Sequence, residues 1–427
     1  MSKRNFITKE EHSEYLSQYS IDPTKAMFTI ILSIIVDVFG YSMVLPLLPV
    51  IITELGSTAL FVGILVSSNA LSALIFGPIW GRLSDRYGRK PILIISQAGT
   101  GISFLILGLS PNVYVILFAR VLDGVFGGQI PVIRAYISDI TTPSTRASEM
   151  GKLMIGHTIG MVFGPIIGGI LGAINWRYPA FIAAGLSVIA IILTIKVLIE
   201  SMPKERVIDL KNRIQNNKLS NNNSKTFSKE IILRFIQVFL LFSITVMFNS
   251  SLSLVLFLRY GASTFIIGLV MTLAGITIML YGGLLMKPLF RKVGEKRVLL
   301  FGSILLILNF IIFPFLYDLW MVFLIIPPFV FTMVFLPSLI QSNITKAVDP
   351  DKQGLVSGMT TNIQSIAQII SPLLATGYLE LGSIAIGTIF LDSYMLIGLT
   401  AVLLGILLFI FLYIDLKRHS YLYSYEK

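Results

Sequence analysis

The sequence GRLSDRYGRK, residues 81–90, places six ionisable side chains within ten positions. It separates two apolar runs, 59–80 and 91–110, in a chain that is otherwise poor in charge. Each run has about 20 residues, which is the length at which an α-helix crosses the hydrocarbon core of a bilayer. The stretch is therefore typical of a loop between two membrane-spanning helices.

Apolar runs of this length recur along the whole chain. Of its 427 residues, 55% are hydrophobic and only 13% are charged, and the mean hydropathy is +0.84. Soluble domains carry about 25% charged residues. We predict an all-α membrane protein with twelve transmembrane helices, and the first helix serves for targeting because no removable signal peptide precedes it. The predicted spans are 26–51, 59–80, 91–110, 113–135, 150–172, 177–197, 231–258, 262–286, 298–316, 319–342, 353–378 and 388–416.

Basic residues fall almost entirely on one side of these spans. Thirty of the 33 Lys and Arg residues lie at the termini or around the loops after spans 2, 4, 6, 8 and 10. Arg177 and Arg259 lie on the opposite side, and Arg120 lies inside a span. Because basic loops remain in the cytoplasm, we expect both termini there, in a multi-pass protein of the cell membrane. The net charge of +11 thus reflects topology, and nucleic acid is not an expected partner.

The two halves of the chain resemble each other at an offset of about 206 residues. Residues 86–90 correspond to 292–296, Pro131 to Pro337 and Pro165 to Pro372. Two six-helix halves around a midplane site are the plan of many secondary transporters, whereas chance similarity of basic loops is the alternative. The predicted organisation is a cytoplasmic N-terminus (1–25), a six-helix bundle (26–199), a polar cytoplasmic linker (200–230, with a surface helix at 203–214), a second bundle (231–416) and a cytoplasmic tail (417–427).

The residue types within GRLSDRYGRK go beyond a topology signal. We expect a tight cytoplasmic turn in which Gly81 and Gly88 permit close backbone approach. Asp85 can accept hydrogen bonds or face a helix N-terminus of the other half, and the arginines can pair with Asp139 at the end of span 4. Positive-inside charge alone would explain only the basic residues. The predicted cytoplasmic gate comprises Gly81, Asp85, Arg86, Gly88, Arg89 and Asp139.

Three ionisable residues are predicted near the bilayer midplane. Asp37 lies about 11 residues, roughly 16 Å, from the cytoplasmic start of span 1, and Arg120 and Asp123 lie roughly 10 and 15 Å from the outer start of span 4. A charge at this depth costs at least about 2.5–3.5 kcal/mol and is normally paired and functional. A carboxylate there can change its protonation as a cavity opens to either side. We assign proton coupling to all three residues, and a static ion pair is the alternative.

Small residues form a stripe along span 5. Four-residue spacing places them on one helix face, which allows very close packing against a neighbour, and Pro165 favours a kink. We expect this stripe to let two half-domains seal and slide. His157 on the same span is more simply a satisfied polar residue than a proton carrier. The stripe consists of Gly156, Gly160, Gly164, Gly168 and Gly172.

The second half has no charged residue at mid-depth and offers uncharged polar and aromatic side chains instead. Such residues suit contact with an amphipathic organic substrate, although each of them can equally serve packing. The candidates are Phe248, Asn249, Phe331, Phe335, Gln364 and Gln368.

Several of these stretches resemble motifs of the major facilitator superfamily. GRLSDRYGRK resembles its loop signature, FARVLDGVFGG (118–128) its fourth-span arginine motif, and GMVFGPIIGG (160–169) the fifth-span motif of its antiporters. DVFGYSMVLPLLP (37–49) is similar to the first span of twelve-span drug:proton antiporters, and AYISDITTPSTRASEMG (135–151) to the tetracycline-exporter branch. The chain departs from the fourth-span motif at Asp123, where Gln is usual, and at Arg134.

The resemblance implies a secondary transporter that exports an amphipathic, drug-like or metabolite compound in exchange for protons. A metabolite or sugar uniporter or symporter on the same fold is the main alternative, and a membrane receptor without transport is another. We find no phosphate-binding loop or catalytic constellation and the chain has no cysteine, so neither an enzyme, a cofactor nor a metal site is expected. The expected partners are the small-molecule substrate, protons and the lipid bilayer, and we expect a monomer.

The charge distribution predicts that the linker is cytoplasmic. An Asn217→Cys variant should escape labelling by a membrane-impermeant thiol reagent in intact cells and react once the cells are permeabilised. Because the chain has no native cysteine, the label reports on this position alone. Labelling of intact cells would contradict the assigned topology.

Overall fold

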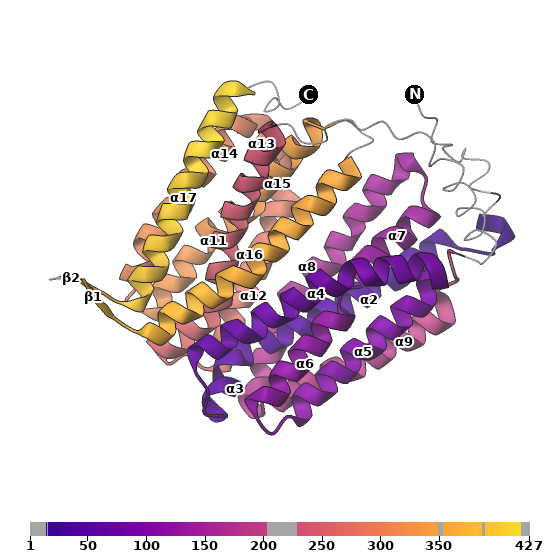
Figure 1. Cartoon of the computed structure of the whole chain (residues 1–427), viewed down its shortest axis with the longest axis horizontal. Helices are drawn as coiled ribbons and strands as arrows, with labels where there is room; N and C mark the ends of the chain where they lie inside the picture. The colour runs from indigo at the N-terminus through magenta and orange to yellow at the C-terminus, as the bar shows by residue number, and fades with distance from the viewer. Residues whose placement is uncertain (1–13, 15, 203–228, 349–352, 387–388, 420–427) are drawn as a thin grey trace. The chain divides into compact units, whose positions relative to one another are not determined.

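A computed structural model of the chain describes residue 14 and residues 16–202, 229–348, 353–386 and 389–419 (Figure 1). Most of the predicted linker, including the expected surface helix at 203–214, lies outside the described residues, as do residues 1–13 and 420–427. Eleven helices of the described part are long and apolar enough to cross a membrane. A twelfth long helix, α16 (Gln353–Leu381), lies at the predicted span 353–378.

The helices follow the predicted spans closely, and several spans consist of two segments. The first six spans are α2 (Pro23–Val44) with η1 (Leu45–Leu47) and α3 (Leu48–Glu54), α4 (Ala59–Tyr87), α5 (Arg89–Leu109), α6 (Val113–Phe126) with α7 (Ile130–Ile140), α8 (Pro143–Ile174) and α9 (Arg177–Val197). The others are α11 (Lys229–Tyr260), α12 (Thr264–Leu280) with the π-helical η2 (Tyr281–Leu285) and α13 (Met286–Val293), α14 (Glu295–Ile312) with η3 (Phe313–Phe315), α15 (Leu319–Lys346), α16 and α17 (Ser393–Arg418).

Two local expectations were wrong. The predicted turn at 81–90 is mostly helix, because α4 continues to Tyr87 and only Gly88 interrupts the path into α5. The last span begins at Ser393 rather than 388, because the Asp392 side chain accepts a hydrogen bond from the Met395 N–H at 2.6 Å and so caps α17. Before it, β1 (Ile384–Ile386) pairs antiparallel with β2 (Ile389–Leu391), which adds a small hairpin to an otherwise helical fold.

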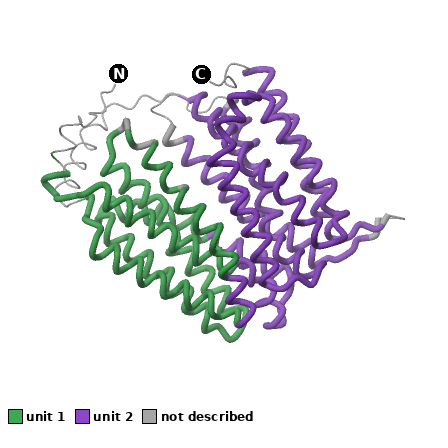
Figure 2. Tube along the Cα trace, turned by 180° about the vertical axis from the view of Figure 1, so that it is seen from behind, with its two compact units in different colours: residues 1–44, 72–167, 175–223 green, residues 45–71, 168–174, 224–427 purple. Residues whose placement is uncertain are grey.

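The chain folds into two compact units (Figure 2). Unit 1 comprises residues 1–44, 72–167 and 175–223, and unit 2 comprises residues 45–71, 168–174 and 224–427. These bounds differ from a simple division at the linker, because α3 packs against α11 and η1 against α12 within unit 2. Three of the first six spans therefore contribute segments to both units.

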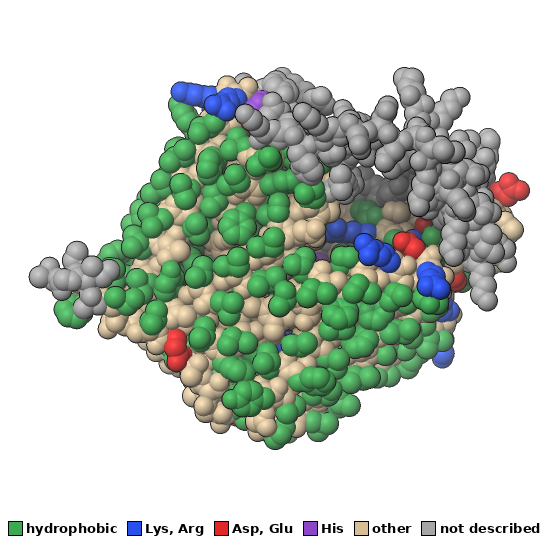
Figure 3. All heavy atoms as spheres, viewed as in Figure 1, with side chains coloured by type: hydrophobic (Ala, Val, Ile, Leu, Met, Phe, Trp, Pro, Cys, Tyr) green, Lys and Arg blue, Asp and Glu red, His purple; other side chains and the backbone are tan. Residues whose placement is uncertain are grey.

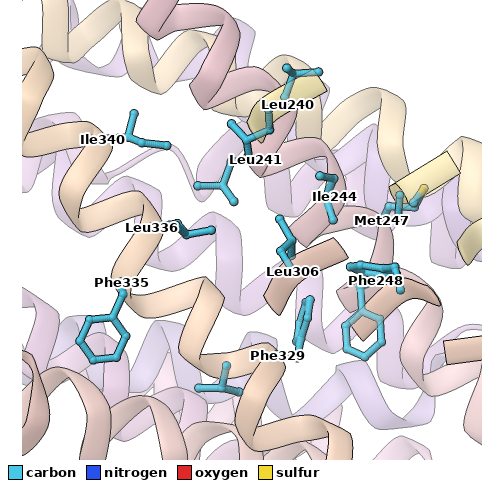
Figure 4. Close-up of a cluster of buried hydrophobic side chains, with 14 of the residues drawn as sticks. Leu240, Leu241, Ile244, Met247, Phe248, Leu306, Phe329, Phe335, Leu336 and Ile340 are labelled. Carbon is cyan, nitrogen blue, oxygen red and sulfur yellow. The ribbon is translucent and has the colours of Figure 1, made fainter. Parts of the chain in front are cut away.

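Each unit has its own apolar core. In unit 1 the core joins residues of α2, α5 and α7, among them Ile30, Leu93 and Ile133. In unit 2 it joins α11, α14 and α15 through residues such as Ile244, Leu306 and Leu336 (Figure 4). The outer surface of α17 is covered with hydrophobic side chains along most of its length, and basic side chains gather at its C-terminal end (Figure 3). This distribution is the one expected of a helix in lipid.

The two basic residues predicted on the outer side both hold a neighbouring helix end. The Arg177 guanidinium donates to the Ser110 carbonyl oxygen at 3.0 Å and lies 4.5 Å from the Trp176 ring centre. Arg259 donates to the Pro314 carbonyl oxygen at 2.8 Å and lies 4.4 Å from the Tyr394 ring centre. These contacts satisfy carbonyl groups that helix ends leave without an intrahelical partner, which gives both residues a structural reason to depart from the charge pattern.

The glycine stripe of α8 packs against α2 inside unit 1. A Cβ atom at Gly160 would lie 2.8 Å from Val38 Cβ and 3.0 Å from the Phe39 backbone nitrogen, and one at Gly156 would lie 3.0 Å from the Ile31 carbonyl oxygen. The Ser42 hydroxyl donates to the Gly160 carbonyl oxygen at 2.8 Å. For this part of the stripe, the close contact is therefore within one unit, whereas we expected a seal between half-domains. The same helix also carries Gly164, Pro165 and Gly168, all buried.

This packing predicts that Gly160→Ala destabilises the protein. The added methyl group meets backbone and a β-branched side chain that cannot give way, and overpacking of this kind costs about 1–3 kcal/mol. Gly185→Ala on α9 is the matched control, because a Cβ there meets nothing within 4 Å and Ala favours a helix. Thermal unfolding in detergent should show a lower midpoint for Gly160→Ala only. Equal midpoints for both variants would contradict close packing at this position.

Candidate functional site in unit 1

A break in the fourth span places a polar residue in the interior of unit 1. Residues 127–129 separate α6 from α7, and Pro131 lies in the first turn of α7, where its missing N–H leaves no bond unmade. A Cβ atom at Gly128 would lie 3.0 Å from the Gly77 Cα atom of α4, so glycine permits this close approach. Gln129, at the start of α7, is only 1% exposed. The interruption thus lies beside a buried amide side chain.

The three predicted midplane residues come together around this amide. Arg120 Nη2 lies 3.3 Å from Asp123 Oδ2, and both side chains are almost fully buried. Asp37 of α2 interacts electrostatically with Asp123 and accepts a hydrogen bond from the Gln129 side chain. Asp37 itself is only partly buried. Carboxyl groups from two different helices are therefore close enough to sense each other's charge.

Two members of this cluster were not anticipated from the sequence. Tyr41, one turn after Asp37 on α2, interacts electrostatically with Arg120 and Asp123. Gln129 is the second. Its signal was the sequence GGQIP (127–131), because paired glycines followed by proline inside a hydrophobic span indicate a discontinuous helix. The position of Tyr41 follows from the α2 helical repeat, but its neighbours on α6 depend on tertiary packing.

The charges in this cluster do not balance when every group is ionised. Two carboxylates and one guanidinium sum to −1, and one bound proton brings the sum to zero. The Phe104 ring lies 5.7 Å from the Arg120 guanidinium and makes one wall apolar. In such surroundings a change of one charge is costly, so the cluster is chemically suited to couple proton binding to the binding of a cation or to a change of shape.

The side chain of His157 lies on α8 and is exposed.

Where α4 meets α5 in unit 1, Arg89 joins the ends of three helices. Its guanidinium lies 2.6 Å from Asp85 Oδ1 at the end of α4 and 3.2 Å from Asp139 Oδ2 near the end of α7. It also donates to Ser84 Oγ at 2.6 Å. The Arg89 side chain is 6% exposed and that of Asp139 11%, whereas that of Asp85 is 61% exposed. The pairing of Arg89 with Asp139 is the one that the sequence suggested.

A further acid, Glu200, completes this network and was missed by the sequence analysis. Its carboxylate accepts the backbone N–H groups of Arg89 and Lys90 at 2.8 and 3.0 Å, and so caps the start of α5. Gly88 has φ 100°, and a Cβ there would lie 2.5 Å from Glu200 Oε2. The glycine is therefore required both by its backbone conformation and by the room that the carboxylate needs.

The other predicted gate residues take smaller parts. A Cβ atom at Gly81 would meet Pro131 Cβ only at 3.8 Å, which is ordinary contact, so Gly81 is not needed for close approach. Arg86 is exposed, and its guanidinium lies 5.3 Å from the Tyr87 ring centre. The structure thus concentrates the interactions of this stretch on Arg89.

The predicted substrate-lining residues of unit 2 fall into two groups. Phe248 is 3% exposed and packs on Phe329 with ring centres 4.1 Å apart, and Phe335 is fully buried 4.4 Å from the Phe331 ring centre (Figure 4). In this structure Phe248 and Phe335 therefore serve the core. The remaining candidates are at least partly exposed: Asn249, Phe331, Gln364 and Gln368.

Comparison with known proteins identifies the family. The sequence matches the Major Facilitator Superfamily over residues 30–372. It is 27% identical over 355 residues to "Tetracycline resistance protein, class H" of Pasteurella multocida, which covers 82% of this chain and 88% of that protein. It is 28% identical over 389 residues to "Multidrug resistance protein 2" of Bacillus subtilis, which covers 89% of this chain and 95% of that protein.

Solved structures agree on the fold. The bacterial homolog of the human lysosomal transporter Spinster, in an inward-facing and occupied conformation, superimposes with a TM-score of 0.73 at 13% identity and covers 94% of this chain and 98% of that one. The predicted family and fold class are thereby confirmed. Because the match spans most of the sequence and the architecture agrees, this chain belongs to the Major Facilitator Superfamily of membrane transporters and is not an enzyme.

Proposed function

We propose that this protein is a proton-coupled antiporter that exports an amphipathic organic compound by alternating access. Its family makes it a transporter of small molecules, and relatives that align over most of its length are named for resistance to tetracycline and to multiple drugs. The observation that carries the proton coupling is the cluster of Asp37, Arg120 and Asp123 in unit 1. Two interacting carboxyl groups beside one guanidinium have a charge that one proton can cancel.

In this proposal Asp37 is the proton carrier. It is the more accessible of the two carboxyl groups, whereas Asp123 already contacts Arg120 on the same helix. Gln129 donates a hydrogen bond to the ionised Asp37, and its amide oxygen is buried without a partner among the described residues. That oxygen can accept a hydrogen bond when Asp37 gains a proton and becomes a donor. Protonation from one side would then disfavour a bound cation, and deprotonation on the other side would favour it, which gives exchange by competition.

The Arg89 network is proposed as the cytoplasmic gate element of unit 1. It joins the ends of α4 and α7 and the start of α5, and Glu200 adds the end of the sixth span. Opening or closing the inner side moves whole helices, so a buried charge network at their ends fixes one arrangement until it is broken. The buried pair with Asp139 should contribute more than the exposed pair with Asp85, because water screens exposed charges.

The substrate is proposed to contact the accessible polar and aromatic residues of the second half as well as the charged cluster. Asn249, Gln364 and Gln368 offer hydrogen bonds without charge, and Phe331 offers an aromatic face. This combination suits a molecule with an apolar body and a few polar groups.

The first prediction of this proposal concerns Asp37. In proteoliposomes with an imposed pH gradient, tetracycline and a fluorescent lipophilic cation serve as probes, and Asp37→Asn should abolish uphill accumulation while downhill exchange continues. With one proton exchanged per molecule, a gradient of one pH unit supports up to about tenfold accumulation. Asp37→Glu keeps the carboxyl group and should retain uphill transport at a lower rate. Uphill transport by Asp37→Asn with unchanged pH dependence would make Asp37 structural and leave Asp123 as the candidate.

The second prediction concerns the gate. Asp85→Asn should lower turnover with little change in substrate affinity, and Asp139→Asn should lower it further, because the latter leaves the buried Arg89 with a single, exposed carboxylate. Initial rates over a range of substrate concentrations separate the two parameters. Normal turnover in both variants would reduce the stretch 81–90 to a topology signal.

A further inference from the structure

The start of α14 in unit 2 repeats the start of α5 in unit 1. Gly88 and Gly294 are the residues immediately before these helices, and they lie 206 positions apart. Their backbones have φ 100° and ψ 157° in one case and φ 88° and ψ 146° in the other. This conformation is largely restricted to glycine. The two helices therefore begin with the same backbone geometry at matching positions of the two halves.

The next residue carries opposite charge in the two halves. Arg89 follows Gly88 and pairs with Asp139, near the end of α7, at 3.2 Å. Glu295 follows Gly294 and pairs with Lys346, in the last turn of α15, at 3.3 Å. Both pairs join the start of a third helix of its half to the end of the fourth, and the Arg89 and Glu295 side chains are almost equally buried, at 6% and 7% exposed. The two ion pairs correspond in place and are reversed in sign.

The reversal changes how each pair fits the helix dipoles. An acid at a helix N-terminus and a base at a C-terminus are both favourable, and Glu295 and Lys346 have this arrangement. Arg89 at the start of α5 and Asp139 near the end of α7 have the opposite one. In unit 1 the carboxylate of Glu200 supplies the negative charge at the amides of α5 that Arg89 lacks. In unit 1 a third segment, through Glu200, thus supplies the favourable negative charge at the helix start, whereas in unit 2 Glu295 itself supplies it.

We propose that Glu295 and Lys346 are positioning residues of the transport cycle, which hold the start of α14 against the end of α15 as Arg89 and Asp139 hold α5 against α7. This inference rests on the proposed transport function for its effect on rate. Its structural part, that the pair joins these two helix ends, stands independently and is measured independently. Neither residue touches the substrate in this proposal.

Hydrogen–deuterium exchange of the full-length protein tests the structural part. Lys346→Met removes the cation, and Glu295→Gln removes the negative charge but keeps a hydrogen-bonding group. An ion pair of this exposure is worth on the order of a fivefold change in an opening equilibrium. Each variant should therefore exchange amides of the last turn of α15 and the second turn of α14 about fivefold faster. The exchanged pair Glu295→Lys with Lys346→Glu should bring these rates back toward the wild type.

A matched control comes from α8. Glu149 and Lys152 have the same two residue types at 2.7 Å, but both residues lie on one helix, so the pair does not join two helices. Glu149→Gln and Lys152→Met should leave exchange at α14 and α15 unchanged. If Glu295 acts only as a charge at the start of α14, Lys346→Met will have no effect on amide exchange. The double variant Glu295→Lys with Lys346→Glu will then show faster amide exchange than either single variant. That result would overturn the proposal.

Transport measurements test the functional part. With tetracycline and the fluorescent cation in proteoliposomes, both single variants should turn over about fivefold more slowly at unchanged KM. The double variant Glu295→Lys with Lys346→Glu restores an ion pair and should recover part of the lost turnover. The recovery should be incomplete because the swapped charges oppose the helix dipoles. If the single variants show faster amide exchange but normal turnover, the ion pair joins the two helix ends as proposed but has no role in the transport cycle. Absence of transport by the wild-type protein would instead count against the proposed function, and the exchange data would still decide the pairing.

Discussion

Removing a charge from water is expensive, and this constraint governs where the ionisable side chains of the protein lie. The buried ones meet an opposite charge or a hydrogen-bonding group: Arg120 with Asp123, Arg89 with Asp139, and the fully buried Arg234 with Asp415 at 3.3 Å. The last two pairs join different helices and so tie tertiary structure together. Arg120 and Asp123 are three residues apart on α6, so the helix by itself brings them within reach of each other.

This difference is the reason for proposing Asp37, rather than Asp123, as the group that changes protonation. Its nearest interactions come from Gln129 and Asp123, which lie on other elements than α2. Its surroundings therefore depend on how α2 packs against α6 and α7, and a movement of these helices changes them. Arg120 and Asp123, in contrast, lie on the same helix, so their backbones stay in register when α6 moves as a unit. The cluster thus contains an ion pair on one helix, Arg120 with Asp123, and a carboxyl group on another helix, Asp37, whose surroundings depend on helix packing.

Interruptions of the helices are a second feature of this fold. Backbone groups inside a bilayer must be satisfied, so breaks occur only where other groups replace the lost hydrogen bonds. At 127–129 the fourth span is broken, and Gln129 beside the break is buried. Gly88 lies between the second and third spans, and there the Glu200 carboxylate accepts hydrogen bonds from the N–H groups of Arg89 and Lys90. The π-helical segment η2 interrupts the eighth span, and its first residue, Tyr281, packs on Phe331 and Phe335.

The sequence by itself determined the spans, the repeat and the residues that had to be special. Hydropathy is a local property, so helix positions could be predicted to within a few residues, and a charge inside an apolar run is visible without a structure. Asp37, Arg120 and Asp123 were identified in this way. Asp139 was expected to pair with the arginines of 81–90, and the structure shows that Arg89 is its partner. Only the tertiary structure decided that Gln129 and Tyr41 join the cluster, that Glu200 caps α5, and that Phe248 and Phe335 belong to a core. The physical reason is that a partner is chosen by which helix faces meet, and residues 111 positions apart, such as Arg89 and Glu200, meet only through packing.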